Sequence, residues 1–167
     1  MENLVDTLAE YRGRRVLITG DTGFKGSWLS LWLQQRGASV FGYALPPESN
    51  SHFNALGLSK LIEHRDGDVR DFKSLSTCIN EINPDIIFHL AAQALVIESY
   101  RDPKSTSDTN IGGSINILEA VRLNPNVKAL VFITSDKCYL NKEVTRGYTE
   151  LDELGGYDPY SASKAVA

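Results

Sequence analysis

The chain has 167 residues, enough for one domain with a sizeable hydrophobic core. Hydrophobic residues make up 42% of it, an ordinary fraction for a globular protein. The net charge is −4 and acidic and basic residues are interspersed, so no basic stripe indicates nucleic acid or a membrane surface as a partner.

The cysteines and the N-terminus bear on where the protein acts. Cys78 and Cys138 form no Cys-x-x-Cys pair and belong to no histidine and cysteine cluster, so we expect reduced thiols and no metal site. The first six residues lack the basic and apolar regions of a signal peptide, and no apolar run is long enough to span a membrane. These features predict a cytoplasmic protein.

A glycine-rich turn dominates the N-terminal part. After a short helix predicted over residues 3–11, apolar residues 16–18 lead into three glycines and a helical pattern over 25–36. Strand, turn and helix in this order are typical of dinucleotide binding. Gly20 would form the turn, Gly23 would admit a pyrophosphate, and Gly26 would let the helix lie close to the strand. The helix N-terminus would attract the phosphates. An ordinary strand-to-helix turn is the alternative.

The second predicted strand, residues 38–43, bears on the choice of dinucleotide. An acidic residue often follows the first glycine by about 20 positions and holds the ribose hydroxyls. Residues 40–44 contain no acid, and residues 37–59 contain no lysine or arginine that could pair with a 2′-phosphate. The missing cation favours NAD, and NADP is not excluded.

A third strand is predicted over 61–65, and Asp68 and Val69 follow it. Ligands of open α/β sheets bind at the carboxyl edge, so both residues are candidate contacts, with a solvated turn as the alternative. Asp71 is predicted to cap a helix that continues to Ile82 and ends before Pro84.

The apolar run 85–93 predicts a fourth strand, buried on both faces. Ala91 and Ala92 would leave space beside a cofactor. His89 is interpreted as a strand residue with a satisfied hydrogen bond, and His52 and His64 have no partners at a suggestive spacing.

Asp102 and Pro103 indicate the start of a helix that runs to about residue 123. Its predicted inward stripe is Ile111, Ile115 and Leu118. Two glycines at 112–113 cost about 1 kcal/mol each relative to alanine, so something is expected to approach the backbone there. Asn110 is a candidate polar contact behind a site.

Residues 128–134 predict a fifth buried strand, followed by Ser135 and a polar loop over 138–157. Five strands alternating with helices predict an α/β fold, a doubly wound parallel sheet of the Rossmann type.

The last predicted helix begins at Asp158 and Pro159 and places Tyr160 and Lys164 one turn apart on one face. A phenol gives up its proton poorly at neutral pH, but a neighbouring ammonium and a cationic nicotinamide favour the phenolate. Tyr160 could therefore take a proton from a sugar hydroxyl as hydride leaves its carbon.

In this order the motifs resemble the extended short-chain dehydrogenase/reductase family. The matching positions are Gly20-x-x-Gly23-x-x-Gly26, Asp68-Val69, Leu90-Ala91-Ala92, Ser135 and Tyr160-x-x-x-Lys164. Stretches 22–29, 134–139 and 155–164 are most similar to the CDP-glucose 4,6-dehydratase branch, which carries Ser-Asp-Lys where related nucleotide-sugar dehydratases carry Thr-Asp-Glu. Asp21 departs from that branch, where histidine is usual, and this bears on cofactor affinity more than on the reaction.

The resemblance implies an NAD-dependent lyase that dehydrates a nucleotide sugar, and it assigns the site residues. The implied cofactor contacts are Gly20, Thr22, Gly23, Phe24, Lys25, Gly26, Asp68, Val69, Leu90, Ala91, Ala92, Tyr160 and Lys164. The implied catalytic residues are Ser135, Asp136, Lys137, Tyr160 and Lys164.

The implied roles divide among these catalytic residues. Tyr160 removes the proton of the 4-hydroxyl, Ser135 hydrogen-bonds that oxygen, and Lys164 holds the ribose. Asp136 would be the acid for the departing 6-hydroxyl and Lys137 the base at C5. A lysine base must be neutral, a form favoured by nearby cations and by loss of water. For Asp136 and Lys137, a surface turn pair is the alternative.

The chain stops within the helix that carries Tyr160 and Lys164, so we expect residues 1–167 to be a truncated NAD-binding domain without its C-terminal substrate domain. Within the family, dimers through helices beside the active site are common, so a homodimer is expected for the full-length protein. Another nucleotide-sugar epimerase or reductase is one alternative function. A catalytically silent dinucleotide-binding fragment is the other.

Overall fold

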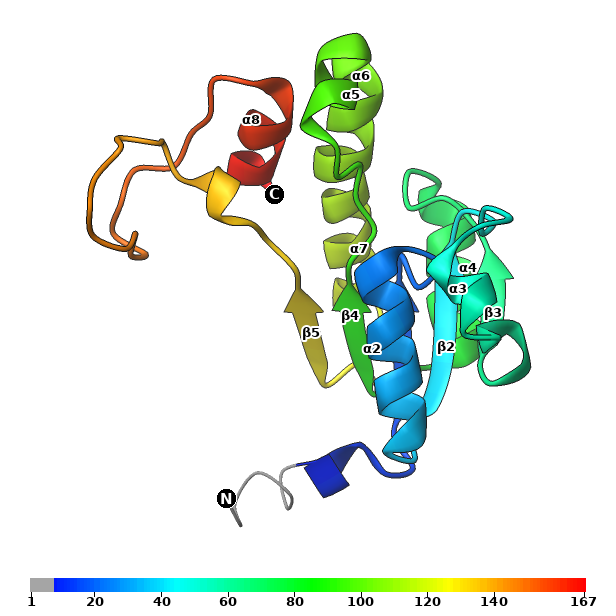
Figure 1. Cartoon of the computed structure of the whole chain (residues 1–167). Helices are drawn as coiled ribbons and strands as arrows, with labels where there is room; N and C mark the ends of the chain where they lie inside the picture. The colour runs from blue at the N-terminus through cyan, green and yellow to red at the C-terminus, as the bar shows by residue number, and fades with distance from the viewer. Residues whose placement is uncertain (1–7) are drawn as a thin grey trace.

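A five-stranded parallel sheet with strand order β3-β2-β1-β4-β5 forms the centre of the computed structural model, which describes residues 8–167 (Figure 1). The strands are β1 (Arg15–Thr19), β2 (Ser39–Ala44), β3 (Glu63–Asp66), β4 (Ile86–His89) and β5 (Ala129–Phe132). All four neighbouring pairs are parallel, which confirms the predicted doubly wound sheet. The strand order reverses at β1 and β4, the position where open sheets of this kind bind ligands.

Helices cover both faces of the sheet. They are α2 (Phe24–Gln35), α3 (His52–Ala55), α4 (Phe72–Ile82), α5 (Val96–Arg101), α6 (Pro103–Ser107), α7 (Gly113–Arg122) and α8 (Pro159–Val166). Shorter helical turns are η1 (Leu8–Tyr11), η2 (Leu58–Lys60), the π-helical η3 (Asp108–Gly112) and η4 (Asp136–Cys138). Of the helix predicted over 3–11, only the part in η1 lies within the described residues. Between residues 8 and 167, no helix is both long and apolar enough to cross a membrane.

Alternation along the central strand explains the two hydrophobic cores. Leu17 packs into the core that includes residues of α4 and α7, whereas Val16 and Ile18 pack into the core on the α2 and α3 side. All three side chains are fully buried. Side chains of consecutive strand residues point to opposite faces, so a continuous apolar run suits a strand covered on both sides.

The predicted helix starts are confirmed by their capping bonds. The carboxylates of Asp71, Asp102 and Asp158 accept hydrogen bonds from the backbone N–H three residues later, at 3.0, 2.8 and 2.9 Å. Each bond satisfies a backbone donor that the first helical turn leaves unpaired. Gly37 has φ of +83° directly after α2, as expected for a glycine that ends a helix.

The predicted inward stripe of the long helix was wrong. Ile115 and Leu118 are 60% and 49% exposed, and the buried residues are Asn110, Gly113, Ser114, Ile117 and Ala120. A Cβ added at Gly113 would lie 2.8 Å from Val69 Cγ2, whereas one at Gly112 would meet nothing within 4 Å. Close packing against Val69 thus requires a residue without a side chain at position 113, and Ile117 is the large apolar residue on the inner face.

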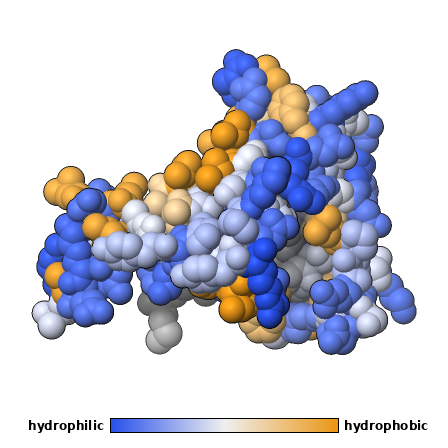
Figure 2. All heavy atoms as spheres, turned by 90° about the horizontal axis from the view of Figure 1, so that it is seen from above, coloured by the Kyte–Doolittle hydropathy of each residue, from blue (hydrophilic) through white to orange (hydrophobic). Residues whose placement is uncertain are grey.

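Several exposed hydrophobic residues lie on neighbouring helices. They are Val96, Ile97 and Tyr100 of α5, Ile115 and Leu118 of α7, and Val166 of α8. Figure 2 looks down on the molecule and shows hydrophobic residues in a band on the side that these helices occupy, whereas the side of β2 and β3 is mainly hydrophilic. We call the six exposed residues the apolar patch.

Other segments also differ from the predictions. Residues 128–134 were expected to form a buried strand, but β5 is an edge strand of the described sheet, and Val131 is 39% exposed. Helix α5, over residues 96–101, was not predicted.

Candidate active site

A cleft of about 610 Å³ lies along the carboxyl ends of the strands, and segments that follow all five strands line it. Its volume is within the usual range for small-molecule and cofactor sites. All thirteen implied cofactor contacts line this cleft: Gly20, Thr22, Gly23, Phe24, Lys25, Gly26, Asp68, Val69, Leu90, Ala91, Ala92, Tyr160 and Lys164. The fold therefore brings together residues that are up to 144 positions apart in the sequence, from Gly20 to Lys164.

The glycine turn at the end of β1 has the close contacts that its glycines predict. Gly20 has φ of +78°, and its N–H donates to the Tyr43 carbonyl oxygen at 3.0 Å. A Cβ added at Gly26 would lie 2.1 Å from the Gly20 carbonyl oxygen, so a side chain at 26 would push α2 away from β1.

The N-terminus of α2 is open towards the cleft. Gly23 is its N-cap and provides no side-chain capping bond, and the first turn of α2 contains no acidic residue. Unpaired N–H groups and the helix dipole make such a terminus a binding site for anions. Because Phe24, Lys25 and Gly26 all line the cleft, the turn fits a pyrophosphate.

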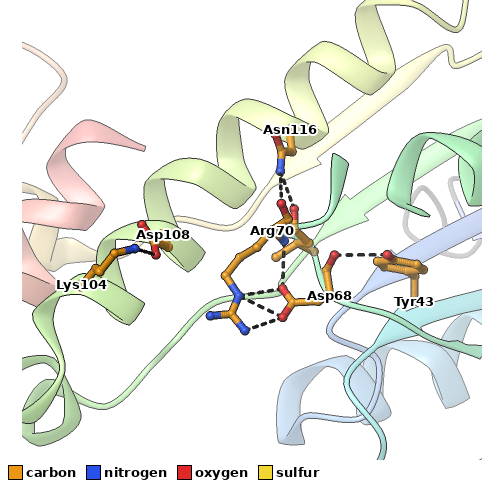
Figure 3. Close-up of polar contacts among 7 residues, drawn as sticks. Tyr43, Asp68, Arg70, Lys104, Asp108 and Asn116 are labelled. Carbon is orange, nitrogen blue, oxygen red and sulfur yellow. Dashed lines mark hydrogen bonds and ion pairs between the residues drawn. The ribbon is translucent and has the colours of Figure 1, made fainter. Parts of the chain in front are cut away.

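The segment after β3 forms a second wall. Arg70 binds the Asp68 carboxylate through Nε at 2.9 Å and Nη2 at 2.6 Å, and this hydrogen bonding lowers the pKa of Asp68 (Figure 3). Tyr43 Oη donates to the Asp68 carbonyl at 3.2 Å, and Asn116 Nδ2 donates to the Val69 carbonyl at 2.9 Å. The segment is thus held by β2 on one side and α7 on the other.

Arg70 was not predicted as a site residue, although it lines the cleft. Its spacing of two residues from Asp68 is a signal that could have indicated the pair. Across the cleft, Ser105 and Thr109 of α6 and η3 were also missed, and Lys104 pairs with Asp108 on the same segment (Figure 3). No motif in the helix marked those positions.

Tyr160 and Lys164, both on α8, line the opposite end of the cleft. Lys164 is only 9% exposed, and this burial lowers its pKa. Nearby, His89 Nδ1 lies 2.7 Å from Thr19 Oγ1, which confirms the predicted satisfied hydrogen bond. Burial, and secondarily the charge of Lys164, lowers the pKa of His89 to about 4. His89 is therefore a neutral strand residue at neutral pH.

Asn110 connects the two sides of this end of the cleft. Its Oδ1 accepts from the Gln93 N–H at 2.8 Å, and its Nδ2 donates to Ser163 Oγ at 2.9 Å. Gln93 belongs to the cleft wall, and Ser163 directly precedes Lys164. Asn110 lies in the π-helical turn η3, and such turns occur frequently at functional sites. The polar contact that the sequence left open is thus a link between β4 and α8.

Ser135, Asp136 and Lys137 lie beside the cleft but do not form its wall. Ser135 caps η4 by accepting from the Lys137 N–H at 3.2 Å, and η4 packs against α8. Asp136 and Lys137 are exposed, so residues 8–167 do not provide the loss of water expected around Lys137. The catalytic roles of these three residues stay predictions.

Asp21 has a partner that the sequence did not indicate. Its side chain is fully buried beneath the glycine turn, and Oδ2 accepts a hydrogen bond from His64 Nδ1 at 2.7 Å. The sequence spacing did not indicate this partner of His64, because β3 brings His64 next to a turn 43 residues earlier in the chain. His52, in contrast, packs its ring against Phe24 and Trp28.

Known proteins share this architecture. The chain is 52% identical over 158 residues to CDP-glucose 4,6-dehydratase from Salmonella typhimurium, a match that covers 94% of this chain and 44% of that protein. An epimerase from Methanothermobacter thermautotrophicus has a TM-score of 0.84 and 28% identity, over 96% of this chain and 47% of that one. A UDP-glucose 4-epimerase from Stenotrophomonas maltophila, solved with NAD and formylated UDP-arabinopyranose, has a TM-score of 0.78 and 29% identity over 92% of this chain and 46% of that one.

The chain thus spans less than half the length of each of these three proteins. A family model described as GDP-mannose 4,6 dehydratase matches residues 17–167, which include the glycine turn, the cleft walls and the Tyr160–Lys164 helix. The match extends over most of the sequence and agrees with the parallel sheet and its cleft, and we conclude that the chain belongs to the GDP-mannose 4,6 dehydratase family.

Proposed function

We propose that residues 1–167 are the dinucleotide-binding domain of a nucleotide-sugar 4,6-dehydratase that converts CDP-glucose to CDP-4-keto-6-deoxyglucose. The observation that carries the proposal is the 52% identity to a CDP-glucose 4,6-dehydratase. The other relatives named above are less similar to this chain and include epimerases, so an epimerase or reductase acting on another nucleotide sugar is the second candidate.

The proposed cofactor is NAD, and the cleft supports this choice. The α2 N-terminus offers N–H groups to a pyrophosphate, and Ala44 and Leu45 at the end of β2 bring no cation to the ribose. Arg70 lies in the same wall, but its guanidinium already binds the Asp68 carboxylate. A 2′-phosphate would have to compete for that guanidinium, which favours NAD over NADP.

The protein side chains would position the sugar and move its protons. Bound NAD would supply the hydride acceptor for C4 and the hydride donor for C6. Tyr160 would take the proton of the 4-hydroxyl, Ser135 would hydrogen-bond the same oxygen, and the buried Lys164 would hold the ribose.

The elimination of water would use the turn after β5. Asp136 would protonate the departing 6-hydroxyl and Lys137 would remove the C5 proton, which the 4-keto group makes acidic. Both side chains are exposed in the part of the chain that the structure describes, so a substrate can reach them.

A homodimer is also part of the proposal. The apolar patch on α5, α7 and α8 is the candidate surface, and a two-fold axis would bury the same residues of both copies. Light scattering of the full-length protein would give the mass of two chains, and a single-chain mass that persists at high concentration would contradict this.

The experiment that tests the function is a substrate assay with the full-length protein. The protein would be incubated with NAD and, separately, CDP-glucose, GDP-mannose or UDP-glucose, and products would be identified by alkaline absorbance of the 4-keto sugar and by loss of water in mass spectra. We expect dehydration of CDP-glucose, and Tyr160→Phe as the inactive control. Inversion without loss of water would support the epimerase, and NAD binding without any turnover would support the silent domain.

A further inference from the structure

The buried carboxylate of Asp21 lies directly behind the cleft. Asp21 is the second residue of the glycine turn, and its neighbours Gly20 and Thr22 line the cleft. The side chain points away from the cleft to His64, and its second oxygen, Oδ1, is buried without a hydrogen-bond partner among the described residues. His64 is therefore the one group described that compensates this carboxylate, and burial of an uncompensated carboxylate is strongly unfavourable.

Gly42 provides the space for this pair. It lies on β2, in register with Ile18 on one side and with His64 on the other. A Cβ added at Gly42 would lie 2.0 Å from Asp21 Oδ2, so any side chain there would expel the carboxylate. Asp21 of the turn, Gly42 of β2 and His64 of β3 are thus closely packed, and the pair needs a glycine at position 42.

The remaining bonds of the turn are neutral and reach only nearby elements. Thr22 Oγ1 donates to the Leu45 carbonyl at 3.1 Å, and Ser27 Oγ donates to the Asp21 carbonyl at 3.0 Å. The Asp21–His64 contact is the charged tie, and it alone among these reaches β3. Hydrogen bonds between charged groups are about twice as strong as neutral ones, so this tie has the largest influence on the shape of the turn.

We propose that Asp21 and His64 form a buried ion pair that holds the glycine turn in its dinucleotide-binding shape, and that both are positioning residues for the cofactor. The inference rests on the proposed function for the identity of the ligand. The pair itself rests on the contacts of residues 21, 42 and 64.

The tie depends on the proton of His64. The groups that face the imidazole are Asp21 from the turn, Asp66 from the same strand at 3.0 Å from Nε2, and the Phe53 ring of α3. Both charged groups are carboxylates, and the hydrogen bond to Asp21 is the main reason that the pKa of His64 is raised.

The sign of the pH effect follows from this raised pKa. His64 is protonated in the folded protein below its ordinary pKa of 6.5, and it loses the proton as the pH rises through the higher folded value. The Asp21 carboxylate is then buried without a cation, and the turn opens to hydrate it. The dissociation constant of NAD rises in inverse proportion to the fraction of protein whose turn keeps the binding shape.

The experiment measures the Kd of NAD by calorimetry from pH 6 to 9 for the full-length protein and its variants. We expect the Kd of the unsubstituted protein to rise at least about fivefold over this range. Asp21→Asn should give a flat profile, because a neutral amide needs no cation. His64→Gln should bind at least about fivefold more weakly at pH 6, because it leaves the carboxylate uncompensated. Asp66→Asn, which removes only the exposed partner of His64, is the matched control and should keep the pH dependence.

A second measurement follows the imidazole without NAD. Titration of His64 by NMR should show a raised pKa that falls towards 6.5 in Asp21→Asn. The double variant Asp21→Asn with His64→Gln buries no charge and serves as the well-folded reference if His64→Gln is unstable. An unshifted His64 titration, or the same pH profile of Kd in Asp21→Asn as in the unsubstituted protein, overturns the proposal. Absence of NAD binding in every form would instead reject the proposed cofactor, while the NMR titration would still decide whether the ion pair exists.

Discussion

The side chains of the candidate site differ in how completely the protein surrounds them. Lys164 is almost fully buried and has no hydrogen-bond partner for its ammonium among the described residues, so it can bind ribose hydroxyls in the cleft. Lys137, on the neighbouring turn η4, is exposed and lies outside the cleft wall. We therefore expect the two lysines to act on different parts of the reaction, with Lys164 at the cofactor and Lys137 at the sugar.

Replacement of Lys137 by alanine tests this division. Because its proposed role is to remove the C5 proton, dehydration by the full-length protein should fall about 100-fold or more, whereas the Kd of NAD should change less than about twofold. Product formation and calorimetry would be measured on the same preparation. Lys142→Ala, which removes an exposed lysine of the following loop, is the control and should keep its activity. Unchanged turnover in Lys137→Ala would exclude the residue from the mechanism.

At the scale of elements, two asparagines on consecutive helical segments hold opposite ends of the cleft. Asn110 in η3 joins the segment after β4 to α8, and Asn116 in α7 holds the backbone of the segment after β3. Asn110 is 2% exposed, so water cannot replace its bonds. The bonds of Asn116 are more accessible, with Nδ2 donating to the Arg70 carbonyl at an exposed position.

Substitution of Asn110 should therefore destabilise the protein more than substitution of Asn116. Asn110→Ala leaves the partly buried Gln93 N–H without its acceptor, which should lower the free energy of unfolding by about 1–3 kcal/mol. Asn116→Ala should lower it by less than about 1 kcal/mol. Urea denaturation of both variants measures the difference, and Asn110→Ala should also reduce turnover because α8 carries Tyr160. Equal losses of stability in the two variants would contradict a larger contribution of Asn110 to the free energy of unfolding.

The sequence predicted the elements whose signals are local and failed where the structure depends on distant residues. Aspartate capping and the glycine turn are short-range effects, and Asp71, Asp102 and Asp158 marked their helices correctly. The buried face of α7 depends on how closely Gly113 approaches Val69, which no spacing within the helix reveals. The Asp21–His64 pair likewise forms only because β3 lies beside β2. The cleft is lined by segments that follow all five strands, so its residues are far apart in the sequence.

For the whole molecule, two histidines on the central sheet respond to pH in opposite directions. His64 on β3 pairs with Asp21 and Asp66, which raises its pKa. Burial, and to a lesser degree the charge of Lys164, lowers the pKa of His89 on β4 to about 4. Protonation of His64 therefore favours the folded state and protonation of His89 opposes it. Their combined effect should place the highest stability near pH 6.5, the ordinary histidine value.

The free energy of unfolding should show one limb for each histidine. Above pH 6.5 stability should decrease as His64 loses its proton, because the unfolded chain loses that proton at lower pH than the folded one. Between pH 6.5 and about 4, the free energy of unfolding should decrease by about 3 kcal/mol. In this range His89 is protonated in the unfolded chain but stays neutral in the folded protein, because its folded pKa is lower. Urea denaturation at half-unit steps from pH 4 to 9 measures both limbs. Since the two sites are on different strands, His64→Gln should abolish only the alkaline limb and His89→Gln only the acid one; loss of both limbs in either variant would mean that the two histidines are coupled through the sheet.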